Sequence, residues 1–84
     1  MATSIRQLKS GDIFFEVDHG VAVRFQASGG PRFDHRANCW TIRAKRQNGV
    51  EIIFAIPENS NACHTPKLFR EGDSELDDSL VFIE

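Results

Sequence analysis

The sequence predicts an all-β fold, a small antiparallel barrel of five strands built from two hairpins and a C-terminal strand. Three observations support this prediction. Apolar and polar residues alternate in four segments, glycine-containing turns join these segments in pairs, and no amphipathic helix longer than about three turns can be traced. The 84 residues leave room for one hydrophobic core, so residues 1–84 are expected to form a single domain.

The first predicted hairpin covers residues 13–27. Each of its strands carries apolar residues at alternate positions: Ile13, Phe15 and Val17 in the first strand, and Val21, Val23, Phe25 and Ala27 in the second. A three-residue loop, 18–20, closed by Gly20 in the left-handed region, would join the strands. That loop pairs the two apolar sets with each other, for example Phe15 with Val23, and turns Phe14 to the opposite face.

The second predicted hairpin covers residues 39–56, and its turn can be drawn in two ways. The dipeptide Asn48-Gly49 alone indicates a two-residue turn. That register would leave Ile52, Phe54 and Ile56 on the face opposite Trp40 and Ile42. A three-residue loop, 47–49, instead pairs Ile42 with Phe54 and sets Lys45 across from Glu51, a favourable cross-strand pair. We therefore predict the three-residue loop.

Alternation along the four strands also divides the side chains between core and surface. The predicted core consists of Phe15, Val23, Phe25, Trp40, Ile42, Phe54 and Ile56. Phe14 and Ile53 lie on outer faces and are large and apolar, so they need cover from the chain itself or from another subunit. We expect Phe14 and Ile53 to contact a protein partner or a second copy of the chain.

The lead-in to the first strand carries a resemblance to a known group of proteins. It reads Leu8-Lys9-Ser10-Gly11-Asp12 and runs directly into Ile13. This resembles the start of many small SH3-like and KOW-like β-barrel proteins that are common in phage and prophage genomes, and the resemblance covers roughly residues 5–56. It implies an SH3-like barrel with a long loop between two hairpins. The opening also resembles that of ribonuclease toxins with this barrel, but their glycine and arginine-proline pattern is absent, so no catalytic residue is carried over.

The segment between the hairpins, residues 28–38, is predicted to be a long exposed loop, and such loops often hold functional residues. Guanidinium groups could bind a phosphate, Phe33 could stack on a base, and two glycines would let the backbone approach an anion. The candidate ligand site comprises Gly29, Gly30, Arg32, Phe33, His35 and Arg36 (with Asp34 in the same loop), and Arg24, Arg43 and Lys45 on the neighbouring strands.

Charge is unevenly distributed, although the net charge is only −2. Residues 1–50 carry eight Lys or Arg against four acids, whereas residues 51–84 carry two against eight. Such asymmetry can mark a basic binding face beside an acidic tail, or the two halves can neutralise each other within one fold. The second half is predicted to contain a loop over residues 58–66, after Pro57, and a closing strand over residues 80–83.

The residue types that perform catalysis or hold metals form no recognisable pattern. Cys39 and Cys63 are 24 residues apart, and in the cytoplasm two free thiols are the expected state. The adjacent Cys63 and His64 would point to opposite sides of an extended chain. We therefore expect no catalytic residues, no metal site and no cofactor.

No apolar run approaches the roughly 20 residues of a membrane span, and the N-terminus carries no signal-peptide pattern. The sequence thus predicts a cytoplasmic protein, in the host cytoplasm if phage-encoded, with no membrane association. The expected function is non-catalytic binding, as an adaptor that contacts a protein and can self-associate. The alternative is binding of a nucleic acid or nucleotide through residues 28–38 and the neighbouring Arg and Lys residues.

Overall fold

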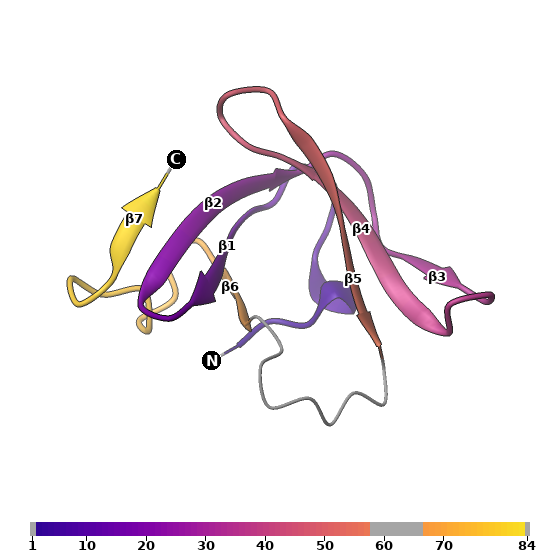
Figure 1. Ribbon diagram of the computed structural model, residues 1–84, viewed down its shortest axis with the longest axis horizontal. Coiled ribbons are helices and arrows are strands. Elements are labelled where there is room, and N and C mark those ends of the chain that lie inside the picture. The colour runs from indigo at the N-terminus through magenta and orange to yellow at the C-terminus, as the bar shows by residue number, and fades with distance from the viewer. Residues whose placement is uncertain (1, 58–66, 84) are drawn as a thin grey trace.

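Seven β-strands and one short 3-10 helix make up the described part of the computed structural model, residues 2–57 and 67–83 (Figure 1). The all-β class is confirmed. In chain order the elements are η1 (Ile5–Gln7), β1 (Ile13–Asp18), β2 (Val21–Ala27), β3 (Arg32–Asp34), β4 (Cys39–Lys45), β5 (Glu51–Pro57), β6 (Lys67–Arg70) and β7 (Val81–Ile83).

The strands form one curled sheet with the order β3-β4-β2-β1-β6. Strand β5 pairs with the second edge of β4, and β7 pairs in parallel with β2. The expected closed barrel of five strands is wrong. Within the described residues β5 pairs only with β4, and the far edge of β6 meets only Thr3, so the two ends of the sheet do not join. The result is an open half-barrel (Figure 1).

The first hairpin has a shorter loop than predicted. Asp18 pairs with Val21, so only His19 and Gly20 form the turn. Both have positive φ, 50° and 77°, which is the conformation of the two-residue type I′ turn. The shift of one residue reverses the faces of β1: Phe14 now lies opposite Phe25, and Phe15 lies opposite Arg24.

The reversed register places Phe14 at the centre of the core, where it is fully buried. Its ring stacks on Phe25 at 5.8 Å and meets Phe54 edge-on at 5.5 Å, while Phe25 and Phe54 lie 4.8 Å apart, also edge-on. The prediction that Phe14 is an outward-facing interface residue is therefore wrong. The inner core cluster consists of Ile5, Leu8, Phe14, Phe25, Ala27, Ile42, Ala44, Phe54 and Leu68, with Val23, Trp40 and Ile52 packed against it.

A second, smaller apolar contact forms on the outer face of β1. Phe15, predicted to be core, is only partly buried and meets Phe82 of β7 edge-on, with ring centroids 5.6 Å apart. Phe69 of β6 pairs with Phe15 and is 5% exposed. These aromatic side chains come from far along the sequence, and they explain how β1 can carry large apolar residues on both faces.

The second hairpin has the predicted register. Ile42 pairs with Phe54, and Lys45 pairs with Glu51, their Nζ and Oε2 atoms lying 3.9 Å apart. The loop 47–49 is closed by Gly49, whose φ is 88°. Of the predicted core residues, Phe25, Ile42 and Phe54 are buried, and Val23 and Trp40 are partly buried.

The closing strand was predicted over residues 80–83, and β7 occupies Val81–Ile83. It runs parallel to β2, and all three of its side chains are exposed, so it adds little to the inner core. The predictions that concern the side chain of Ile56, the loop over 58–66, Cys63 and His64 lie outside the described residues.

Candidate functional site

The predicted loop 28–38 contains a short strand, and this strand divides the predicted ligand site. Within β3, Arg32 pairs with Thr41 and Phe33 pairs with Trp40. Successive residues of a strand point to opposite faces. Arg32 therefore lies on the outer face of the sheet, and Phe33 lies on the inner face beside Trp40.

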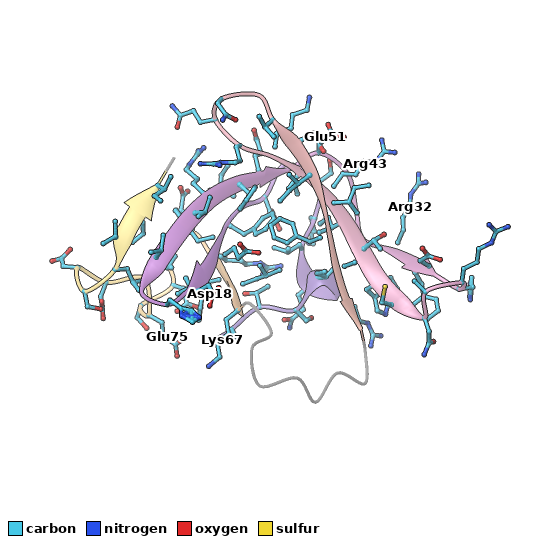
Figure 2. All side chains as sticks on the ribbon, in the orientation of Figure 1. Asp18, Arg32, Arg43, Glu51, Lys67 and Glu75 are labelled. Atoms are coloured by element: carbon cyan, nitrogen blue, oxygen red, sulfur yellow. The ribbon has the colours of Figure 1, made fainter. Side chains whose placement is uncertain are left out.

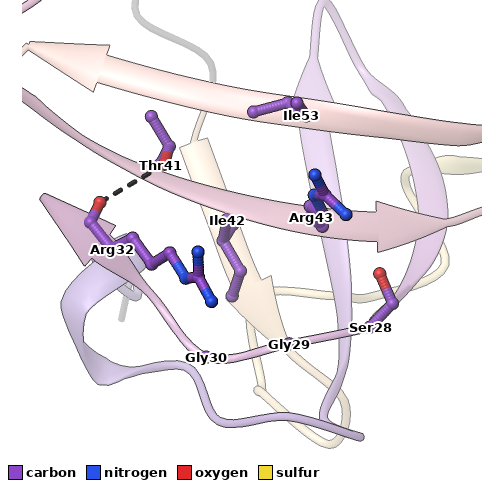
Figure 3. A pocket seen from close by; sticks show the side chains of 8 residues that line it. All are labelled: Ser28, Gly29, Gly30, Arg32, Thr41, Ile42, Arg43 and Ile53. Carbon is purple, nitrogen blue, oxygen red and sulfur yellow. Dashed lines mark hydrogen bonds between the residues drawn. The ribbon is translucent and has the colours of Figure 1, made fainter. Parts of the chain in front are cut away.

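A pocket of about 340 Å³ opens on the outer face, between the segment 28–30 and β4 (Figure 3). It contains four of the nine predicted ligand residues and Ile53, which was predicted as an interface residue. The residues that line it are Ser28, Gly29, Gly30, Arg32, Thr41, Ile42, Arg43 and Ile53. The lining combines two guanidinium groups with apolar surface and contains no carboxylate.

The pocket lies along the edge of β4 that pairs with β2 and β3, and hydrogen bonds to β4 fix both ends of the segment that borders it. The Ser28 N–H donates to the Arg43 carbonyl at 2.9 Å, and the Thr41 hydroxyl donates to the Arg32 carbonyl at 3.3 Å. Between these two contacts the chain passes through Gly29 and Gly30, and nothing lies within 4 Å of where their Cβ atoms would be. The segment therefore leaves room beside β4, and Figure 3 shows the side chains of Arg32 and Arg43 on either side of Ile42.

The charges around the pocket favour an anion. The side chain of Arg43 is 68% exposed and lies 4.0 Å from Glu51, whose other carboxylate oxygen is near Lys45. One carboxylate thus faces two cations, and Arg32 adds a third positive charge on the same side of the molecule (Figure 2). Ion pairs this exposed and this long contribute little to stability, so Arg43 is available to a ligand.

The remaining predicted basic residues lie outside the pocket. Lys45 and Arg24 are on the outer face of β4 and β2, since Lys45 pairs with Gln26, two positions from Arg24. His35 and Arg36 are exposed in the turn after β3. The Asp34 carboxylate forms this turn by accepting the N–H groups of Arg36 and Ala37 at 2.9 and 3.2 Å.

The aromatic residues of the predicted site form a separate cluster on the inner face. Phe33 meets His35 at 4.9 Å and Trp40 at 5.5 Å, both edge-on. The Arg6 guanidinium lies 5.2 Å from the centre of the Trp40 ring, a cation–π contact. The structure therefore does not bring Phe33 together with Arg32 and Arg43 as one site for a base and its phosphate.

Three of the lining residues were not predicted from the sequence: Ser28, Thr41 and Ile42. The register of the second hairpin was a usable signal, because it sets Arg43 directly opposite Ile53 on the outer face. Ile53 is 61% exposed, in agreement with the predicted outward orientation.

Other kinds of site have less support in the described residues. No group of three or more His, Cys, Asp or Glu side chains there could hold a metal ion. Cys39 is a buried free thiol. Within residues 2–57 and 67–83, no helix is long and apolar enough to span a membrane.

Comparison with models of protein families, with curated proteins and with solved structures gave no significant match.

Proposed function

We propose that this chain is a non-catalytic binding protein that holds an acidic group of a protein partner in the pocket between residues 28–30 and β4. The observation that carries the proposal is the pair Arg32 and Arg43 at one pocket with an exposed isoleucine, Ile53, beside them. A carboxylate could accept hydrogen bonds from either guanidinium, and an apolar neighbour of that carboxylate could cover Ile53.

The size and composition of the pocket suit such a role. A volume of about 340 Å³ is at the lower end of the range of small-ligand pockets, about 300–1,000 Å³. It accommodates one side chain or a chain terminus better than an extended ligand. Interfaces typically combine an arginine with apolar surface in this way.

The separation of the two pocket arginines from Phe33 and Trp40 favours a protein over a nucleic acid as the ligand of the pocket. Single-stranded nucleic acids are bound by aromatic side chains that stack on bases next to cations that contact phosphates. Here Phe33 and Trp40 lie on the inner face, whereas Arg32 and Arg43 lie on the outer face. The net charge of −2 is also unlike that of most nucleic-acid-binding domains.

We also propose that the fold is related to the SH3-like barrels that the lead-in to β1 resembles. Two hairpins joined by residues 28–38 are in the order that the resemblance implies, and this order is what supports it, while the described strands form an open half-barrel. We take the pocket as the binding site that this arrangement provides at the junction of the hairpins.

NMR spectroscopy of the 15N-labelled protein tests the proposal. The probes are a glutamate-rich peptide containing leucine, its glutamine-substituted counterpart, and a single-stranded oligothymidylate. We expect the acidic peptide to shift the amide signals of Gly29, Gly30, Arg43 and Ile53. The double variant Arg32→Ala, Arg43→Ala should lose at least about tenfold in affinity, whereas Arg36→Ala, an exposed arginine outside the pocket, should bind as the unmodified protein does.

Each other outcome contradicts the proposal in a different way. Equal binding of the glutamine peptide would show that charge plays no part. Tighter binding of oligothymidylate at the same amides would replace the protein partner with a nucleic acid. Absence of shifts at the pocket with all three probes would mean that the pocket binds no anion.

A further inference from the structure

We propose that the free edge of β5 pairs with β5 of a second copy of this chain, in antiparallel orientation and with the twofold axis at Ile53. The inference rests on the backbone of the second hairpin and does not require that the pocket bind an anion, although Ile53 belongs both to the pocket lining and to the proposed interface. It assigns Ile53 an interface role, in a geometry that only the structure reveals.

The hydrogen bonds of the hairpin show which backbone groups of β5 face away from β4. The Arg46 N–H donates to the Val50 carbonyl at 2.9 Å, so this pair is a hydrogen-bonded pair of the antiparallel ladder. Such pairs alternate with pairs whose N–H and C=O groups face away from each other. Ile53 pairs with Arg43, one step out of phase with the hydrogen-bonded pairs, so its N–H and C=O groups face away from β4. The same holds for Glu51 and Ala55.

Strand β4 supports this alternation independently. The Arg43 carbonyl accepts the Ser28 N–H on the far edge of β4, away from β5. Its pairing partner Ile53 must then direct its own N–H and C=O groups away from β4. Within the described residues these groups have no strand partner, because β5 pairs there with β4 alone.

The length of the usable edge places its centre at Ile53. The hairpin loop ends at Val50, and Pro57 at the other end has no N–H to donate. Glu51, Ile53 and Ala55 remain, and all three have exposed side chains. An edge that presents exposed apolar surface without a charge at its centre is a favourable template for strand pairing.

A second copy is the occupant that this edge fits best. In the twofold register Ile53 lies opposite Ile53 of the second copy, and each Glu51 lies opposite Ala55 rather than another carboxylate. The two 61%-exposed isoleucines then cover each other. The pairing forms about six inter-strand hydrogen bonds, because three residues on each strand offer both an N–H and a C=O.

The dimer places two pockets at a fixed separation. What this means for binding rests on the proposed function. A twofold axis between antiparallel strands is perpendicular to the sheet, so both pockets open on the same face. Three strand spacings separate the two β4 strands, about 14 Å. A partner with two acidic groups at a comparable spacing would bind both pockets with higher avidity.

Light scattering coupled to size-exclusion chromatography, with sedimentation equilibrium for the dissociation constant, tests the dimer without any ligand. We expect the unmodified protein to reach twice its monomer mass of 9.5 kDa. The variants Ile53→Asp and Ile53→Lys should each raise the dissociation constant at least about 100-fold, since like charges then meet at the axis. An equimolar mixture of the two should restore the doubled mass.

The control is Val50→Asp, a similarly exposed residue (51%) at the hairpin tip, which should still dimerise. Circular dichroism establishes that each variant is folded. A protein that is monomeric at about 0.5 mM would have a dissociation constant in the millimolar range or weaker, and this would overturn the proposal. An Ile53→Asp variant that remains dimeric would overturn it as well. Folded monomers that fail to associate when mixed would overturn the twofold register. Because no ligand is present, none of these outcomes bears on the anion pocket.

Discussion

Phe14 lies directly opposite Phe25 across the β1–β2 pair, with the two rings stacked at a centroid distance of 5.8 Å and inclined by 23°. Replacing Phe14 with alanine should lower the free energy of unfolding by about 3–5 kcal/mol, because it leaves a cavity at the centre of the core. The matched control is Phe15→Ala, at a half-buried position, and it should lower the free energy of unfolding by about 1–2 kcal/mol. Urea unfolding measures both values. A larger loss for Phe15→Ala would indicate the three-residue loop instead of the observed register.

The turn between β1 and β2 requires a left-handed residue at position 20. Gly20 has a φ of 77°, and a Cβ there would meet nothing within 4 Å. Gly20→Ala should therefore destabilise the protein by about 1–2 kcal/mol through backbone strain alone. Gly30 is equally unobstructed and has no positive φ, so Gly30→Ala should change stability by less than about 0.5 kcal/mol. Equal thermal shifts for the two variants would contradict the type I′ turn.

Glu16 lies on the inner face of β1, opposite Val23. Burial raises the pKa of its carboxyl group above the ordinary value of 4.5, and the neighbouring Asp18 raises it further. The folded state thus binds this proton more tightly than the unfolded chain does. The associated stability is present below pH 4.5 and is lost as the pH rises through the higher folded-state pKa.

Glu16→Gln should therefore raise the unfolding temperature at pH 7 and leave it nearly unchanged at pH 4. Asp73 and Asp77 have pKa values lowered by hydrogen bonds, from the Glu75 N–H and from Ser79 respectively. Their contributions are lost only as the pH falls below about 3.8, so the two effects occupy separate pH ranges. A Glu16→Gln variant with the same gain at both pH values would show that ionisation of Glu16 is not the cause.

Glu51 competes with any anion for Arg43, because its Oε1 atom lies 4.0 Å from the guanidinium. Glu51→Gln should strengthen binding of the glutamate-rich peptide about threefold, the size of one screened charge at this range. Stability should change by less than about 0.5 kcal/mol, since both ion pairs are exposed. NMR titration and thermal unfolding measure the two quantities. Weaker peptide binding in this variant would argue that Glu51 positions Arg43 instead of competing for it.

The two hairpins differ in how well their sequences specify the register. In the second hairpin only one loop length puts Trp40 and Ile42 on the same face as Phe54, and the structure has that register. In the first hairpin the alternation of Ile13, Phe15 and Val17 predicts the wrong face, because the adjacent Phe14 is equally large and is the residue that the core buries. The deciding contacts come from Phe69 and Phe82, which are more than 50 residues away and cover Phe15.

The candidate site, too, could be predicted only in part from the sequence. Glycines followed by arginines at residues 29–36 indicated an anion site, and Gly29, Gly30 and Arg32 do line the pocket. The presence of β3 was not predicted, because its three residues lack a clear alternation. Its pairing with β4 decides that Arg32 lies on the same face as Arg43 and lines the same pocket, while Phe33 lies opposite Trp40.

The sequence by itself determined the all-β class, the strands of both hairpins and the register of the second one. These depend on local alternation and turn residues, which act between neighbours in the chain. Only the tertiary structure decided that Phe14 rather than Phe15 is in the core, that the sheet stays open, and that Arg32 and Arg43 share a pocket. Each of these outcomes depends on which strand lies beside which, and that choice is made by the burial of side chains distant in sequence.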